Sequence, residues 1–285
     1  MESLISNERW RSDTADEMKP TLEQPAMTDE SADSRTASDE AVICSNLFRR
    51  LGVTPYYQNQ WCAVLKGDCR EILPGLPDQC FDLMLTDPPY GVDFVSNHRT
   101  ATPSWGAIAG DDGSLDVMDC LKVALEKLTH SAHLYIFGTF DLSKLKITTP
   151  VELIWDKEIM SGGDLDCPWG KEHEPIWFAC NGARLGKAAV NGRGLTAKKR
   201  QGSVLRVQRP TAGGCVNHPT EKPVELLQKL IESSTLHGET ILDPFVGSGS
   251  TLVAAHREGR YAVGIELEER HCETAAKRLE QLGAW

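Results

Sequence analysis

The sequence predicts an α/β fold built on a doubly wound, mostly parallel sheet, with an antiparallel hairpin at one sheet edge and a small basic insert. Two observations favour it. Short apolar runs alternate with helical patterns from about residue 56 onward, and a glycine-rich loop lies between a predicted strand and a predicted helix. With 285 residues, 40% of them hydrophobic and 25% charged, the chain has the composition of one large domain with appendages.

The first 40 residues differ from the rest of the chain. They contain eleven Asp and Glu against four Lys and Arg, and they show almost no periodic apolar pattern. Such a segment cannot bury enough surface to offset the entropy lost on ordering. We expect a disordered acidic tail over residues 1–40 and one domain over residues 41–285. Because the tail supplies most of the formal net charge of -11, the overall acidity says little about the surface of the domain.

Cysteine usage and hydropathy indicate the compartment. The nine cysteines include no Cys-x-x-Cys pair and have no His partner at zinc-ligand spacing, so we expect reduced thiols and no metal site. No apolar run approaches the roughly 18 residues of a membrane span, and the N-terminus is polar and acidic rather than basic and then apolar. These features favour a cytoplasmic protein.

The first half of the domain is predicted to begin with a strand over residues 81–86. Two prolines close this apolar run, and because proline lacks an amide donor they must end the strand. Apolar residues recur every three or four positions between Leu115 and Leu128, which predicts an amphipathic helix, and a strand follows at 133–137. Residues 151–155 and 175–180 are interpreted as two further strands that form the edge hairpin.

The second half of the domain repeats the alternation. Residues 223–233 predict a helix with proline near its start, and residues 240–242 predict a short strand. The glycine-rich stretch 243–251 then leads into a helix that ends near residue 258. A strand over 261–265, ending at Glu266, and a final amphipathic helix over 268–282 complete the domain.

The glycine-rich loop has the features of a cofactor site. Gly247 and Gly249 let the backbone turn sharply and approach a ligand closely. Glu266, 19 residues after Gly247, can accept hydrogen bonds from both hydroxyls of a ribose. Asp243 can pair with an ammonium group, and the ring of Phe245 can pack on a purine. Only two glycines of the dinucleotide fingerprint are present, so the pattern favours an adenosine-type cofactor, and a plain tight turn is the alternative.

The tetrapeptide Asp87-Pro88-Pro89-Tyr90 directly follows the first predicted strand. Two prolines stiffen the backbone, so the Asp87 carboxylate and the Pro88 carbonyl oxygen can be two fixed acceptors beside an aromatic face. An amino group on a planar base needs this set: the acceptors bind its two hydrogens and Tyr90 stacks on the ring. No covalent enzyme intermediate is required if the donor is an activated methyl group. A rigid turn that ends the strand is the alternative.

Together these residues resemble the DNA amino-methyltransferases of the permuted class called beta, in which the catalytic half precedes the cofactor half. The similarity covers about residues 60–282 and includes the segments 66–69, 87–90, 173–174, 218–223 and 243–251 with Glu266. The resemblance implies a Rossmann-like methyltransferase fold with S-adenosylmethionine as cofactor. It implies the cofactor-binding residues Asp68, Thr220, Lys222, Asp243, Pro244, Phe245, Gly247, Ser248, Gly249, Ser250, Thr251 and Glu266, with Asp68 near the adenine and 220–223 closing the methionine end.

The resemblance also bears on the substrate. In doubly wound sheets, ligands bind at the carboxyl ends of the central strands where the strand order reverses, here the strands ending at Thr86 and Leu242. Family members with Asp first in the tetrapeptide usually modify adenine, and those with Ser first usually modify cytosine. We therefore expect a site-specific adenine methyltransferase that flips the target base out of duplex DNA and methylates it directly. The alternatives are a cytosine amino-nitrogen or RNA methyltransferase, and a catalytically silent DNA-binding relative.

Residues 184–215 are predicted to be a short target-recognition insert. Between Arg184 and Arg209 there are eight Lys and Arg and no Asp or Glu, which suits phosphate contacts and probing of base edges. The expected DNA-binding residues are Arg184, Lys187, Arg193, Lys198, Lys199 and Arg200. A solvated loop is the alternative.

A homodimer and a cognate restriction endonuclease are compatible with the sequence, which decides neither. The packing residues are expected to include Trp10, Trp61, Trp155, Trp169 and Trp177.

Overall fold

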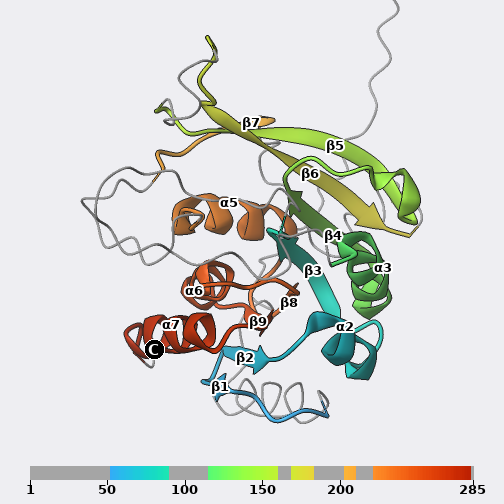
Figure 1. Cartoon of the computed structure of the whole chain (residues 1–285), viewed down its shortest axis with the longest axis vertical. Coiled ribbons are helices and arrows are strands. Elements are labelled where there is room, and N and C mark those ends of the chain that lie inside the picture. The colour runs from blue at the N-terminus through green and yellow to red at the C-terminus, as the bar shows by residue number, and fades with distance from the viewer. Residues whose placement is uncertain (1–51, 90–114, 160–167, 183–201, 210–220, 284–285) are drawn as a thin grey trace, which may run out of the picture. The chain divides into compact units, whose positions relative to one another are not determined.

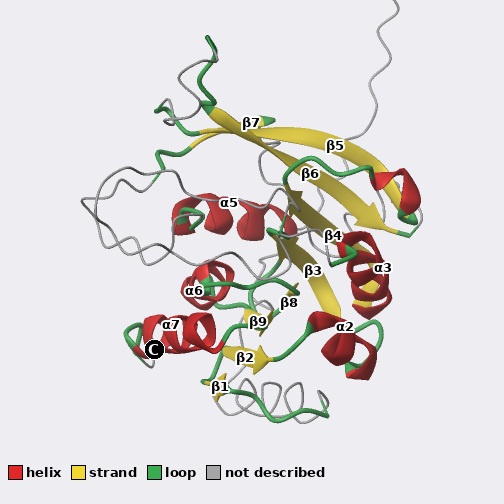
Figure 2. Ribbon diagram, viewed as in Figure 1, coloured by secondary structure: helices red, strands yellow, loops and turns green. Residues whose placement is uncertain are grey.

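The computed structural model describes residues 52–89, 115–159, 168–182, 202–209 and 221–283. These residues form a nine-stranded sheet in the order β1-β2-β9-β8-β3-β4-β6-β5-β7, with helices on both faces (Figures 1 and 2). The strands are β1 Tyr57–Gln58, β2 Cys62–Lys66, β3 Phe81–Thr86, β4 Leu128–Phe137, β5 Ile147–Asp156, β6 His173–Asn181, β7 Val204–Arg206, β8 Thr240–Asp243 and β9 Tyr261–Glu266. The helices are α2 Cys69–Ile72, α3 Val117–Lys127, α5 Val224–Ser234, α6 Ser250–Arg257 and α7 Glu269–Glu280, with short 3-10 helices η1 Leu73–Gly75 and η2 Leu142–Lys144.

The centre of the sheet is parallel. Strands β2, β9, β8, β3 and β4 run in one direction, while β1 is antiparallel to β2, and β6 is antiparallel to both β4 and β5. Helices α5, α6 and α7 lie on one face of the sheet, and α2 and α3 lie on the other (Figure 1). The chain therefore winds outward from the middle in both directions, which confirms the doubly wound α/β fold.

The central strands are buried on both faces, which explains their nearly continuous apolar sequences. Leu83, Met84 and Leu85 of β3 are fully buried, as are Ala262 and Val263 of β9. Helix boundaries have local causes as well. The Asp116 side chain accepts a hydrogen bond from the backbone N–H of Asp119 at 3.1 Å and so caps α3. Strong burial and local caps together explain why most elements could be predicted from the sequence.

Strand β3 has the predicted bounds, and the predicted hairpin is present as β5 and β6. Its placement at the sheet edge is wrong, because β7 pairs in parallel with the outer side of β5. Strand β7 comes from the predicted basic insert. The Trp155 indole Nε1 donates a hydrogen bond to the backbone oxygen of Val207 at 2.7 Å, which anchors the chain directly after β7. The rest of that insert, residues 184–201 and 210–215, lies outside the described residues, as does the predicted acidic tail.

The tryptophans divide into two groups. Trp61 and Trp155 are buried in the core, as predicted for packing residues. Trp169, which precedes β6, is 82% exposed, so its interpretation as a packing residue is wrong. Trp177 is partly buried and Trp10 lies outside the described residues. Among the described helices, none has the length and hydropathy to cross a bilayer.

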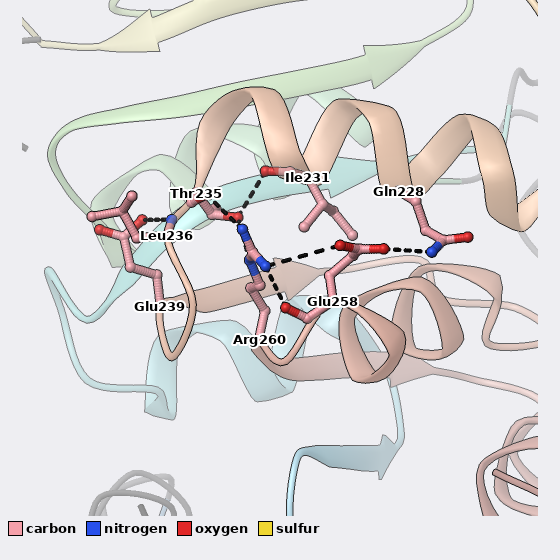
Figure 3. A network of polar contacts seen from close by, with 7 residues as sticks. All are labelled: Gln228, Ile231, Thr235, Leu236, Glu239, Glu258 and Arg260. Atoms are coloured by element: carbon pink, nitrogen blue, oxygen red, sulfur yellow. Dashed lines mark hydrogen bonds and ion pairs between the residues drawn. The ribbon is translucent and has the colours of Figure 1, made fainter. Parts of the chain in front are cut away.

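A polar network joins α5 to the turn between α6 and β9, at the amino ends of β8 and β9 (Figure 3). Arg260 donates hydrogen bonds to the hydroxyl of Thr235 at 3.1 Å, to the backbone oxygen of Thr235 at 2.8 Å and to the backbone oxygen of Glu258. The amide of Gln228 donates to the Glu258 carboxylate. Because the partners of Arg260 are the residues directly after α5 and α6, the network fixes the ends of both helices relative to β9.

Candidate functional site

The carboxyl ends of β3 and β8 are neighbours. The two strands pair in parallel, with Leu83 opposite Ile241 and Met84 opposite Leu242. At their ends, the Thr86 hydroxyl donates a hydrogen bond to Oδ1 of Asp243 at 2.7 Å, and both residues are buried. The predicted catalytic segment begins with the residue after Thr86, and the predicted cofactor segment begins at Asp243. These segments therefore lie side by side, as expected, although they are 157 residues apart in sequence.

The glycine-rich loop has a backbone that requires glycine at two positions. Gly247 has φ +52° and Gly249 has φ +85°, in the left-handed region that L-residues rarely adopt. Gly249 is also the N-cap of α6, and a Cβ atom there would lie 2.7 Å from the Cβ of Ala275 in α7. Ser248, Ser250 and Thr251 are buried in the same turn. Glycine is thus required at both positions of this turn by the backbone dihedral angles, and at Gly249 also by the close approach of helix α7.

Glu266 lies at the end of β9, beside this loop. Its carboxylate accepts hydrogen bonds from the backbone N–H of Gly247 at 3.0 Å and of Glu268 at 2.7 Å. Burial nevertheless raises the pKa of Glu266 to about 7, against the two N–H donors. The backbone N–H of Gly67 donates to the backbone oxygen of Glu266 at 2.9 Å, which brings Asp68 to the same edge of the sheet.

Asp68 has a structural role in the described contacts. Its side chain caps α2 by accepting a hydrogen bond from the backbone N–H of Arg70 at 2.8 Å, and it forms an ion pair with the Arg70 guanidinium at 2.5 Å. These Arg70 contacts lower the pKa of Asp68. Asp68 is therefore an ionised carboxylate that is held in place beside the end of β2.

Asp243 is a carboxylate in an apolar setting. Only 3% of its surface is exposed, and it accepts hydrogen bonds from the Thr86 hydroxyl and from the backbone N–H of Phe245 at 3.1 Å. Burial raises the pKa of Asp243 to about 6, which the hydroxyls of Thr251 and Thr86 partly oppose and the charge of Asp87 reinforces. A positively charged ligand group beside Asp243 would stabilise the ionised form.

Lys222 contacts Asp87 directly. Its side-chain Nζ lies 2.5 Å from Oδ2 of Asp87 and 3.5 Å from Oε2 of Glu174, and 5.1 Å from the centre of the Phe137 ring. Burial would lower the pKa of Lys222, but the two carboxylates outweigh it and the net pKa is raised. The buried ammonium is therefore charged. The family resemblance implies a cofactor contact for Lys222, and nothing in the sequence indicates its contact with Asp87.

Glu174 and Lys157 extend this charge cluster into the β5–β6 hairpin. Nζ of Lys157 lies 2.6 Å from Oε1 of Glu174 and 5.3 Å from the centre of the Trp155 ring. Burial raises the pKa of Glu174, but Lys222 and Lys157 together produce a net lowering. Glu174 was identified from the sequence only as part of the family resemblance. A glutamate at the start of an otherwise apolar strand is the signal that could have marked it.

Arg278 of α7 connects two segments of the site. Its Nη1 donates hydrogen bonds to the backbone oxygen and hydroxyl of Ser248 at 2.9 and 3.1 Å and to the hydroxyl of Ser250 at 3.1 Å. Its Nη2 lies 2.7 Å from Oε1 of Glu221, the residue before Lys222. Arg278 thereby ties the glycine-rich loop to the segment that carries Lys222. Nothing in the local sequence of α7 indicated this role.

The structure brings most of the predicted site residues to one edge of the sheet. Pro88 and Pro244 are buried, and Pro89 and Phe245 are partly exposed, each in the loop where the sequence placed it. Tyr90, Thr220 and the six predicted DNA-binding residues lie outside the described residues.

Comparison with known proteins shows the family to which this chain belongs. The family model described as DNA methylase (N6_N4_Mtase) matches residues 137–277. YubD of Escherichia coli (strain K12), a protein named provisionally as a methylase, is 30% identical over 223 residues, which cover 75% of this chain and 88% of that protein. The chain belongs to the DNA methylase family. This family uses S-adenosylmethionine as methyl donor, which confirms the predicted cofactor and the amino-methyltransferase resemblance.

Other relatives of this DNA methylase agree with the assignment. The Type II methyltransferase M2.DpnII of Streptococcus pneumoniae is 28% identical over 254 residues, covering 79% of this chain and 92% of the relative. Two solved structures share the fold, which confirms its Rossmann-like methyltransferase type. The M1.HpyAVI–SAM complex has a TM-score of 0.56 at 19% identity and covers 76% of this chain and 98% of its own. The PvuII DNA methyltransferase (cytosine-N4-specific) has a TM-score of 0.57 at 17% identity and covers 80% and 89%.

Proposed function

We propose that this DNA methylase transfers a methyl group from S-adenosylmethionine to the exocyclic amino nitrogen of adenine at a specific site in duplex DNA. The hydrogen bond between Thr86 and Asp243 is the observation that carries the proposal. It joins the catalytic segment to the cofactor segment at one sheet edge. Direct methyl transfer depends on such proximity, because donor carbon and acceptor nitrogen must meet in line.

The cofactor half supplies groups that fit the donor chemically. When bound, S-adenosylmethionine provides an activated methyl group. The Glu266 carboxylate would accept hydrogen bonds from the ribose hydroxyls, and the buried Asp243 would be stabilised by the ammonium of the methionine part. The positive φ angles of Gly247 and Gly249 let the backbone pass close to the ligand. Asp68, beside the end of β2, suits contact with the adenine end.

The catalytic half supplies the acceptor side. The Asp87 carboxylate and the Pro88 carbonyl oxygen would bind the two hydrogens of the amino group, and Tyr90 would stack on the flipped base. As the nitrogen lone pair forms the new bond to the methyl carbon, the nitrogen becomes more acidic. It then loses one hydrogen as a proton, which the Asp87 carboxylate can accept. The bond between carbon and sulfur breaks with its electron pair staying on sulfur.

The choice of adenine rests on the aspartate that opens the tetrapeptide, as the family resemblance implies. Methylated DNA should be digested to nucleosides and analysed by mass spectrometry. We expect N6-methyladenine nucleoside as the product. The appearance of N4-methylcytosine instead would replace the adenine assignment and keep the class of reaction.

The role of Asp87 is tested by substitution. Asp87→Ala should lower the methyl-transfer rate by about a hundredfold to a thousandfold or more, the range found when one group that stabilises developing charge is removed. Its affinity for S-adenosylmethionine, measured by calorimetry, should stay within a few-fold of wild type. Asp119→Ala, which removes a carboxylate paired with Lys122 on the surface of α3, is the matched control and should keep full activity. Full activity of Asp87→Ala would refute the proposal.

We propose that the insert over residues 184–215 contacts DNA, because it is positively charged. Positive charge in this part of a net acidic chain comes from Arg184, Lys187, Arg193, Lys198, Lys199 and Arg200, which would contact the phosphates of duplex DNA. The cytoplasm is the proposed compartment, on the cysteine usage of the chain. Each lost phosphate contact should reduce the slope of log affinity against log salt concentration by about 0.9. Alanine substitution of the Lys198–Arg200 run should therefore flatten the salt dependence of binding to a DNA duplex. An unchanged slope would exclude phosphate contacts by these residues.

A further inference from the structure

Four charged side chains of alternating sign form a row beside the site. Asp87 lies 2.5 Å from Lys222, Lys222 lies 3.5 Å from Glu174, and Glu174 lies 2.6 Å from Lys157. They come from the loop after β3, the segment before α5, strand β6 and the residue directly after β5. Carboxylates and ammonium groups are equal in number, so the row is formally neutral. The hairpin is thus in contact with the proposed catalytic carboxylate through a single lysine.

Burial makes this balance important. The side chains of Lys222 and Lys157 are only 8% and 7% exposed, so neither ammonium can rely on water for its stabilisation. A buried charge needs an oppositely charged neighbour, and removing one partner leaves the other poorly compensated. Among the described residues, Lys222 has two such neighbours. Its shorter contact is with Asp87, and its longer contact is with Glu174.

We propose that Glu174 is a positioning residue for methyl transfer, because its negative charge shares the Lys222 ammonium with Asp87 and limits how strongly Lys222 binds the catalytic carboxylate. This inference rests on the proposed role of Asp87. If Glu174 were neutral, the whole charge of Lys222 would act on Asp87 and the row would carry one excess positive charge. Asp87 would then be a weaker acceptor for the amino hydrogen and for the proton that leaves the methylated nitrogen.

Lys157 completes the arrangement from the other oxygen of Glu174. It binds Oε1, while Oε2 is the oxygen directed at Lys222. A carboxylate held through one oxygen has fewer rotamers available, so the other oxygen stays near Lys222. Lys157 itself is held over the Trp155 ring at the end of β5. Among the described residues, Lys157 therefore reaches Lys222 through Glu174.

Two substitutions at position 174 separate charge from shape. Glu174→Gln keeps the size of the side chain and removes its charge, whereas Glu174→Asp keeps the charge and removes one methylene. We expect Glu174→Gln to lower kcat, at saturating DNA and S-adenosylmethionine, by roughly tenfold to a hundredfold, as for residues coupled in one network. Glu174→Asp should retain kcat within about fivefold of wild type. A packing role would give the opposite order and would overturn the proposal.

The link through Lys157 is tested by non-additivity. Lys157→Met should lower kcat, and the double variant Lys157→Met with Glu174→Gln should be no slower than Glu174→Gln alone. Multiplied losses in the double variant would show that Lys157 acts by another route. Glu273→Gln, which removes a carboxylate paired with Lys277 on the exposed face of α7, is the matched control and should leave kcat unchanged. Circular dichroism at the assay temperature confirms that each variant is folded.

The result for wild type distinguishes the two levels of inference. If the wild-type protein transfers no methyl group to DNA, the proposed function has failed and the role of Glu174 fails with it. If wild type is active, Asp87→Ala is inactive and Glu174→Gln is as fast as wild type, only the role of Glu174 is overturned.

Discussion

Two basic side chains that are largely shielded from solvent lie at opposite ends of the parallel strands, and their surroundings differ. Arg260, at the amino end of β9, donates its hydrogen bonds to a hydroxyl and to backbone oxygens, and its nearest carboxylate contact, with Glu258, is 4.0 Å long (Figure 3). Lys222, near the carboxyl ends of the strands, contacts two carboxylates. Burial lowers the pKa of Arg260, whereas the carboxylates raise that of Lys222 despite its burial.

We expect this difference to separate a structural cation from a functional one. Backbone oxygens have fixed positions and partial charges, so they satisfy Arg260 and hold the elements around it together. Carboxylates carry full charges that can change when a substrate binds or a proton moves. A cation between carboxylates can therefore respond to chemistry, while a cation among carbonyl oxygens stabilises the fold. The first is expected to affect rate, and the second is expected to affect stability.

Replacing Lys222 should give the largest effect. Lys222→Met keeps an apolar stem beside Phe137 but removes the charge that holds Asp87. We expect kcat to fall by about a hundredfold to a thousandfold, because the Asp87 carboxylate loses the contact that holds it in position. Steady-state assays at saturating DNA and cofactor measure this loss. A variant with normal kcat would break the comparison, since Lys222 would then resemble Arg260.

Replacing Arg260 should affect stability. Arg260→Met leaves the backbone oxygens of Thr235 and Glu258 without their donor, and hydrogen bonds to charged groups contribute about 1.5–3 kcal/mol. The free energy of unfolding should fall by about 2–3 kcal/mol in urea titrations. The kcat of the folded variant should remain within twofold of wild type. A large loss of kcat without loss of stability would contradict the structural role.

The pH dependence of cofactor binding should arise from Glu266, near the carboxyl ends of the strands, and not from Arg260. The pKa of Glu266 is raised to about 7, so this carboxyl is protonated below that pH and can then accept fewer hydrogen bonds from ribose hydroxyls. Affinity for S-adenosylmethionine should therefore fall about tenfold between pH 8 and pH 6. Calorimetry with Glu266→Gln, which removes the titrating group, should show weaker binding with this pH dependence lost. Arg260→Met should keep the wild-type pH dependence.

The stability of the cofactor-free protein should change with pH in the opposite direction. Because burial raises the pKa values of Glu266 and Asp243 in the folded state, that state binds more protons than the unfolded chain between the unfolded and folded pKa values. These two groups therefore destabilise the fold as pH rises from about 4 to 7. Replacing either with its amide should reduce this decline in urea titrations, and an unchanged decline would show that the carboxyls are not titrating there.

The smallest effect is expected at Arg278, which combines features of both cations. It donates to loop oxygens, as Arg260 does, and contacts the Glu221 carboxylate. Arg278→Lys keeps the charge but cannot bridge both segments with one planar fork, so affinity for S-adenosylmethionine should fall about threefold to fivefold. Lys277→Ala, which removes an exposed ion pair, should leave affinity unchanged. An unaffected Arg278→Lys variant would show that the bridge does not order the loop.

Which features could be predicted from the sequence depends on how far apart in sequence the interacting residues are. Strand β3 was predicted with its bounds because two prolines after Thr86 end it locally. The turn at Gly247 and Gly249 was predicted because dihedral preferences are local as well. Strand β7 was missed, since three residues carry too little periodicity and its partner β5 is about fifty residues away in sequence, as the 52-residue separation of Trp155 and Val207 indicates.

The ion pairs of the site depend on tertiary packing. Lys222 and Asp87 are 135 residues apart, and only the assembled sheet brings them together. The residue types at the site could be chosen from the sequence because their chemistry matched the expected reaction. Their partners could not, because neither Lys157 nor Arg278 belongs to a motif. The sequence thus predicts which groups are needed, and the fold determines which group each one contacts.

The close contact between Gly249 and Ala275 has a consequence for the C-terminal helix. No methyl group fits between them, so helix α7 sets how far the turn can move toward it. Enlarging Gly249 would displace the turn or the helix, and bulk added at Ala275 would act on the turn in the same way. Helix α7 contributes none of the predicted cofactor ligands, yet its packing against Gly249 limits the shape that the glycine-rich turn can adopt.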